Sequence, residues 1–209
     1  MKPAAIILAG GASSRFGGDK LAAELDGRPV LEHALRAVAG MADPVVVVVG
    51  PDAPSPSVPP GLAVEVVPAR DLVAHMGPLA GLAGGLDALA SWAGSSIAGR
   101  GPDVAIVVAG DMPTLVPEVL ALLAAALDAD PALGIACLET EPASPLPAAV
   151  RISLALPAAT ALLAADRRGL RGLIGAVPSA LVPSAAWRAI DPDGRTLHDI
   201  DTPEDLPGR

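Results

Sequence analysis

A short glycine-rich segment near the N-terminus contains the residue types that bind a polyphosphate. Residues 8–20 read LAGGASSRFGGDK and directly follow an apolar run. Gly10 and Gly11 would let a phosphate approach the backbone N–H groups closely, and the hydroxyls of Ser13 and Ser14 can donate further hydrogen bonds. The segment therefore predicts a loop that cradles phosphate groups.

Two cations complete this segment. Arg15 and Lys20 bring fixed positive charge into a chain whose net charge is −9 and which has only two lysines beside twelve arginines. Lys20 is preceded by Asp19 and followed by Leu21, so the Gly-Lys-Ser/Thr of a Walker A loop is absent, and the glycine spacing does not match GxGxxG. We expect a polyphosphate site of another kind, the alternative being an ordinary strand-to-helix loop.

A carboxylate follows a second apolar run. Asp111 follows residues 103–109 after a single glycine, and Pro113 fixes the turn beyond it. Magnesium typically takes one or two protein carboxylates and completes its shell with water and substrate phosphate oxygens. Asp111 is therefore a candidate Mg²⁺ ligand, the alternative being an N-cap for a helix beginning near Leu115.

These residues must be positioned by regular elements, which alternate along the first 130 residues. Apolar runs predict strands at 4–9, 44–49, 62–67 and 103–109, and proline-started segments predict helices at 29–39, 78–92 and 117–127. Strands that are apolar on both faces belong to parallel sheets covered by helices. The predicted fold class is α/β, with a doubly wound, mostly parallel twisted sheet that gathers both motifs at the carboxyl ends of its strands.

The alternation of predicted strands and helices is less regular after Gly134. Strands are expected near 135–138 and 148–151, and helices near 153–165 and 169–176. We expect this part to add a small antiparallel element to the same sheet. A length of 209 residues favours one domain, 1–209.

Composition excludes several classes of function. Aromatic residues make up 1% of the chain, and the acidic balance offers no basic face, which argues against nucleic acid as a partner. The longest apolar run, 119–127, is too short to span a membrane. The one cysteine, Cys137, cannot form an internal disulfide. We expect a cytoplasmic protein, and the sequence leaves the oligomeric state open.

The glycine-rich segment resembles the LAGGxSxRMGxxK signature of nucleotidyltransferases with a Rossmann-like core, most closely the molybdenum cofactor guanylyltransferases of the MobA type. Three further stretches are similar to motifs of that family in the same order: ARDLVAHMGPLAGLAGGL from Ala69, GDMPTLVP from Gly110 and DIDTPEDL from Asp199. Phe16 stands where the family signature has Met. The resemblance covers nearly the whole chain.

The resemblance implies transfer of GMP from GTP to the terminal phosphate of molybdopterin, with release of pyrophosphate and Mg²⁺ as cofactor. It implies a nucleotide-binding half, 1–130, and an acceptor-binding half, 131–209. Arg15, Lys20 and Asp111 would be the catalytic residues. The implied nucleotide-binding residues are Leu8, Ala9, Gly10, Gly11, Ser13, Lys20, Asp71, Gly77, Pro78, Leu79 and Asp111.

Some positions leave the base and the acceptor open. Asp199 and Asp201 stand where the guanylyl family usually has Asn; they could add a metal ligand, with Asp201 the favoured position, or cap a last helix at 202–206. The arginines within 167–171 would either face solvent or guide the acceptor phosphate. The alternatives are cytidylyl transfer to the same cofactor, transfer to another phosphorylated acceptor, or a catalytically silent nucleotide-binding module. Gly11 favours guanylyl transfer, because cytidylyl relatives typically carry Ala there.

Overall fold

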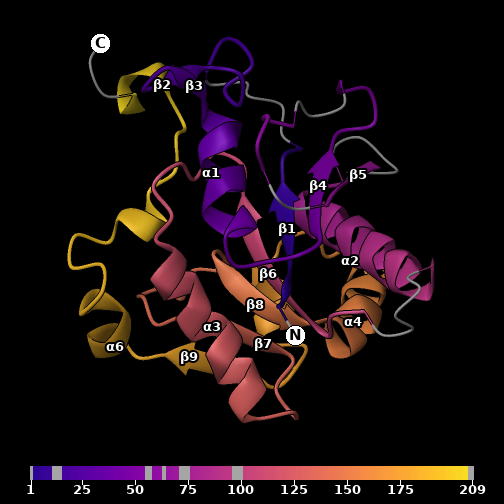
Figure 1. Ribbon diagram of the computed structural model, residues 1–209. Coiled ribbons are helices and arrows are strands. Elements are labelled where there is room, and N and C mark those ends of the chain that lie inside the picture. Colours follow the sequence, from indigo (N-terminus) through magenta and orange to yellow (C-terminus); the bar gives the residue numbers. More distant parts are fainter. Residues whose placement is uncertain are drawn as a thin grey trace.

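The frame of the protein is a seven-stranded sheet in the order β5-β4-β1-β6-β8-β7-β9 (Figure 1). The computed structural model describes residues 2–10, 16–54, 58–62, 65–70, 76–95 and 101–206. The strands of the sheet are β1 (Ala4–Leu8), β4 (Val45–Val49), β5 (Val66–Arg70), β6 (Val104–Ala109), β7 (Ile135–Leu138), β8 (Ala148–Arg151) and β9 (Ser179–Val182). A separate hairpin is formed by β2 (Glu24–Leu25) and β3 (Arg28–Pro29).

Most strand pairs are parallel, as the alternating pattern predicts. β1 lies between β4 and β6, with Ala5 paired to both Val45 and Ile106. β8 runs antiparallel to its neighbours β6 and β7, while β7 and β9 are parallel. The predicted fold class is confirmed, including the antiparallel element in the C-terminal half.

Helices cover both faces of the sheet (Figure 1). One face carries α1 (Val30–Ala39), α3 (Pro117–Ala129) and α6 (Ser184–Arg188), and the other carries α2 (Pro78–Ser95), α4 (Ile152–Ala164) and α5 (Arg171–Ile174). Side chains of β1 alternate between the two cores: Ala5 and Ile7 face α1 and α3, and Ala4 and Ile6 face α2. Among the described residues, no helix has the length and hydropathy that a membrane crossing requires.

The main correction concerns the strand predicted at 62–67, which lies instead at Val66–Arg70 and contains Pro68. Because β5 is an edge strand, it tolerates a proline, which has no N–H to donate to a neighbouring strand. The helix predicted at 169–176 is the single turn α5. The sequence did not predict three short elements, namely the β2–β3 hairpin, the edge strand β9 and helix α6. Each is too short to show a periodic pattern of apolar residues.

The C-terminal segment returns to the first helix. Two 3₁₀ turns, η1 (Arg195–Leu197) and η2 (Pro203–Asp205), lie in this segment. Ile200 and Leu206 form a small buried cluster with Leu25 and Val30, against which Phe16 packs. In Figure 1 this yellow segment runs up beside α3 to the β2–β3 hairpin. The last motif of the sequence is thereby held against the segment that contains Lys20.

Helix α2 packs closely against the sheet where glycines face it. A Cβ on Gly85 would come within 2.7 Å of Ile6 Cγ2 and 3.0 Å of Val48 Cγ2, both on buried β-branched side chains with stiff rotamers. Gly94, near the end of the same helix, has no described atom within 4 Å of the equivalent point.

This difference yields a matched pair of variants. Overpacking costs about 1–3 kcal/mol, which exceeds the helix-propensity gain of alanine over glycine, about 1 kcal/mol. Gly85→Ala should therefore lower the free energy of unfolding, while Gly94→Ala should leave it unchanged or raise it by up to about 1 kcal/mol. Urea denaturation followed by circular dichroism measures both; equal stabilities would contradict the close packing of α2.

Candidate active site

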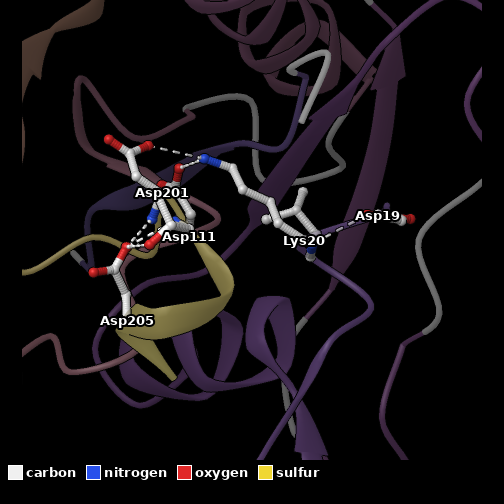
Figure 2. A network of polar contacts seen from close by, with 7 residues as sticks. Asp19, Lys20, Asp111, Asp201 and Asp205 are labelled. Atoms are coloured by element: carbon white, nitrogen blue, oxygen red, sulfur yellow. Dashed lines mark hydrogen bonds and ion pairs between the residues drawn. The ribbon is translucent and has the colours of Figure 1, made fainter. Parts of the chain in front are cut away.

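The centre of the site is an ion-paired lysine. Lys20 Nζ donates to Asp111 Oδ2 at 2.5 Å and lies 3.6 Å from Asp201 Oδ1 (Figure 2). The three side chains come from the segment before the β2–β3 hairpin, from the turn after β6 and from the C-terminal segment. Two carboxylates and one ammonium thus meet at the carboxyl edge of the parallel strands, where α/β sheets bind ligands.

Lys20 keeps its charge in this environment. Burial lowers the pKa of its ammonium, but the hydrogen bond and charge of Asp111 and the charge of Asp201 outweigh burial and leave the pKa above its ordinary value. A lysine in this state does not act as a base. It is a fixed cation that can neutralise a phosphate oxygen.

Asp111 presents its second oxygen without a partner. Oδ1 is buried and has no hydrogen bond to any residue that the structure describes. Asp111 does not cap a helix, because α3 begins at Pro117 with Val116 as its N-cap residue. A buried carboxylate oxygen left unpaired beside the loop predicted to bind phosphate has the chemistry that a hard cation would satisfy.

The described residues therefore suit a magnesium ion, but they could not supply all of its ligands. In the parts of the chain that the structure describes, no group of three or more His, Cys, Asp or Glu side chains could hold a metal. Asp111 would be the principal ligand, with Asp201 nearby. Phosphate oxygens and water would have to fill the remaining positions, as is usual for Mg²⁺.

The cap of the last turn is made by neither Asp199 nor Asp201. The carboxylate of Asp205 accepts hydrogen bonds from the N–H groups of Asp201 and Thr202 and from the Thr202 hydroxyl (Figure 2). Those bonds hold the pKa of Asp205 below its usual range. The Asp201 side chain faces Lys20 instead. Burial, together with the charges of Asp201 and Asp111, raises the pKa of Asp199.

A buried aspartate that the sequence analysis did not single out supports the turn after β6. Asp191 accepts hydrogen bonds from the N–H groups of Arg195 and Thr196, at 3.1 and 2.8 Å. The Thr196 hydroxyl in turn accepts from the N–H of Val116. Because Ile200 N–H also donates to the Asp111 carbonyl, the C-terminal segment holds the Asp111 turn at both ends.

The glycine-rich segment is described at residues 8–10 and again from Phe16 onward. Leu8 ends β1 and its carbonyl accepts from Gly110 N–H, which sets the first predicted motif beside the Asp111 turn. Ala9 N–H donates to the Val48 carbonyl at 2.7 Å. The predicted residues Gly11, Ser13, Arg15 and Asp71 lie outside the described residues, as does Ser14.

The GPLAG turn leads into α2 and contacts the loop before α5. Gly77 has a φ of +81°, and a Cβ there would lie 2.9 Å from the Arg168 carbonyl. Pro78 is the first residue of α2, and Leu79 donates its N–H to that same carbonyl while its side chain is buried in the core. This N–H is thus already bonded to protein. The Arg168 side chain pairs with Asp166 at 2.9 Å.

Comparison with known proteins identifies the family of this chain. The family model described as the MobA-like NTP transferase domain matches residues 5–181. The chain belongs to this family. Membership confirms the resemblance and the enzyme class expected from the sequence, a nucleotidyltransferase.

Relatives in this family match along nearly the whole chain. A probable molybdenum cofactor guanylyltransferase of Chloroflexus aggregans is 30% identical, covering 99% of this chain and 92% of the relative. The molybdenum cofactor guanylyltransferase of Rhodobacter capsulatus is 32% identical, covering 99% and 94%.

Solved structures share the fold. Molybdopterin-guanine dinucleotide biosynthesis protein A of Archaeoglobus fulgidus has a TM-score of 0.72 at 21% identity, covering 97% of this chain and 94% of that one. The 2-C-methyl-D-erythritol 4-phosphate cytidylyltransferase of Thermus thermophilus has a TM-score of 0.64 at 19% identity, covering 99% and 96%.

The Asp191 network predicts a pH-dependent loss of stability. Burial raises the pKa of Asp191, but the N–H groups of Thr196 and Arg195 outweigh burial and leave the pKa below its ordinary value. Its stabilisation is therefore present above the unfolded pKa of about 3.9 and is lost as the pH falls through the folded value. Asp191→Asn should cost about 1–3 kcal/mol at pH 7, since the amide turns a donor toward an N–H.

Denaturant titrations of wild type and Asp191→Asn at pH 7 and near pH 3 measure this effect. The difference between the two proteins should shrink at the lower pH. Asp193→Asn, an exposed neighbour in the same turn, is the control and should behave like wild type. A difference that does not depend on pH would show that the carboxylate charge is not what holds the turn.

Proposed function

We propose that this protein transfers GMP from GTP to the terminal phosphate of molybdopterin, releasing pyrophosphate in a Mg²⁺-dependent reaction. The observation that carries the proposal is the charged Lys20 held by Asp111 and Asp201 at the carboxyl edge of the sheet. The names of the relatives from Chloroflexus aggregans and Rhodobacter capsulatus support the same reaction.

The chemistry needs positioning more than covalent help. The attacking phosphate oxygen of the acceptor is already anionic, so no strong base is required, and the protein must align it with the α-phosphate of GTP. Lys20 would neutralise the charge that grows on the leaving pyrophosphate. Gly10, Gly11 and Ser13 would cradle the phosphates with backbone and hydroxyl donors, and Arg15 would add a second cation.

Asp111 is the residue proposed to hold the magnesium ion, with Asp201 as a second carboxylate nearby. When bound, the ion would supply positive charge to the phosphates. The proposal is supported by the unpaired, buried Oδ1 of Asp111. Two carboxylates that face one ammonium also leave net negative charge at this point, which favours a further cation.

The nucleotide is assigned to residues 1–130 and the acceptor to residues 131–209. Asp71 and the turn from Gly77 to Leu79 are proposed to contact the nucleoside. The arginines within 167–171 are the proposed guides for the acceptor phosphate, a role for Arg167 and Arg171 in particular, since Arg168 pairs with Asp166. The proposed compartment is the cytoplasm, in line with the buried thiol of Cys137, whose pKa burial raises to about 12.

The role of Lys20 can be tested against the other lysine of the chain. Lys20→Ala should lower pyrophosphate release from GTP with molybdopterin by at least about 100-fold, because the leaving-group charge loses its counter-ion. Lys2→Ala is the matched control, since Lys2 is exposed and lies before β1, at the opposite end of that strand. Near-normal turnover by Lys20→Ala would contradict the assignment. Tight GTP binding without pyrophosphate release by wild type would favour a silent nucleotide-binding module.

The choice of base is tested by comparing GTP with CTP. The fold alone does not select between them, since a cytidylyltransferase has the same architecture. We expect kcat/KM for GTP to exceed that for CTP by about 100-fold or more with molybdopterin as acceptor. Measured pyrophosphate release that is equal or greater with CTP would contradict the choice of GTP and favour the cytidylyl alternative.

A further inference from the structure

Arg70, the last residue of β5, binds backbone carbonyls of the loop after β4. Its Nη1 donates to the carbonyls of Pro51 and Ala53 at 2.9 and 2.7 Å, and lies 3.5 Å from that of Gly50. The residues at 50–54 form a tight turn, closed by a hydrogen bond from Ala53 N–H to the Gly50 carbonyl. One guanidinium nitrogen thus contacts three of the carbonyl groups of this turn.

The main chain of Arg70 is itself fixed, so the guanidinium starts from a rigid base. Arg70 pairs with Val49 in the parallel ladder of β4 and β5. On the other side helix α2 passes closely, and a Cβ on Gly84 would lie 3.6 Å from the Arg70 carbonyl. Strand and helix together hold the point from which the side chain reaches the turn.

The turn that Arg70 holds borders the glycine-rich segment. A Cβ on Gly10 would lie 3.5 Å from the N atom of Gly50 and 3.8 Å from the carbonyl carbon of Val49. Ala53 packs against the core beside β4. Asp111 lies on the other flank of β1, after β6. The 50–54 turn and Asp111 thus lie on opposite flanks of β1, so a nucleotide whose phosphates bound near Lys20 and Asp111 would have the turn on its β4 side.

We propose that Arg70 is a positioning residue for the nucleotide: by tying back three carbonyls it holds the 50–54 turn as a wall of the nucleoside pocket. This inference rests on the proposed function. Arg70 acts through the turn and not on the reacting phosphates. Its effect is therefore uniform binding, which is the same in the ground state and the transition state and changes KM without changing kcat.

Two variants separate this role from a general loss of structure. Arg70→Met keeps the length of the aliphatic chain but cannot donate, and it should raise KM for GTP about tenfold with kcat within about twofold. Arg70→Lys should restore most of the KM, because one ammonium has three N–H donors and a single nitrogen makes all three contacts in the wild type. Arg36→Met is the control, since Arg36 lies on α1 and pairs with Glu32.

The kinetics are measured as pyrophosphate release with molybdopterin and Mg²⁺, together with thermal unfolding of each variant. An unchanged KM in Arg70→Met, a fall in kcat alone, or equal defects in the Met and Lys variants overturns the inference. If wild type releases no pyrophosphate from GTP, the proposed function fails. The role of Arg70 is then tested by calorimetric measurement of GTP binding. Weaker binding by Arg70→Met than by Arg36→Met supports the role of Arg70, and equal binding overturns it.

Discussion

The ammonium group of Lys20 is the constraint on which the site depends. Its partner Asp111 lies 91 residues away in sequence, and Asp201 comes from the far end of the described chain. Without a cation between them, two carboxylates so placed would repel each other in a partly buried position. One of the two lysines of the chain thus lies where three segments meet, and those segments come from both halves of the sequence.

The sequence predicted the parts of this arrangement that follow a period or a motif. β1, β6 and Lys20 with Asp111 were all identifiable, since buried parallel strands read as apolar runs and ligands gather at their carboxyl ends. Asp191 and Arg70 were not, because each binds backbone groups of a distant loop, and such contacts leave no spacing in the sequence. β5 was misplaced because an edge strand tolerates Pro68.

In the proposed reaction, base recognition and charge compensation fall on opposite flanks of β1. On the β6 side lie the aspartates and Lys20, which suit any triphosphate. On the β4 side the described turn at 50–54 offers mostly backbone groups, and the chain has no Asn or Gln to read a base.

The contacts of the C-terminal segment affect the order in which parts of the molecule fold. The contact from Ile200 to the Asp111 turn joins the end of the described chain to its middle, and the contact from Leu206 to the β2–β3 hairpin joins it to the first third. Contacts of such long sequence separation form late, because loop-closure entropy must be overcome first. During synthesis the sheet strands β1, β4 and β6 can assemble well before Asp201 leaves the ribosome. A nascent chain would therefore hold a folded scaffold before Asp201 can join Lys20 and Asp111.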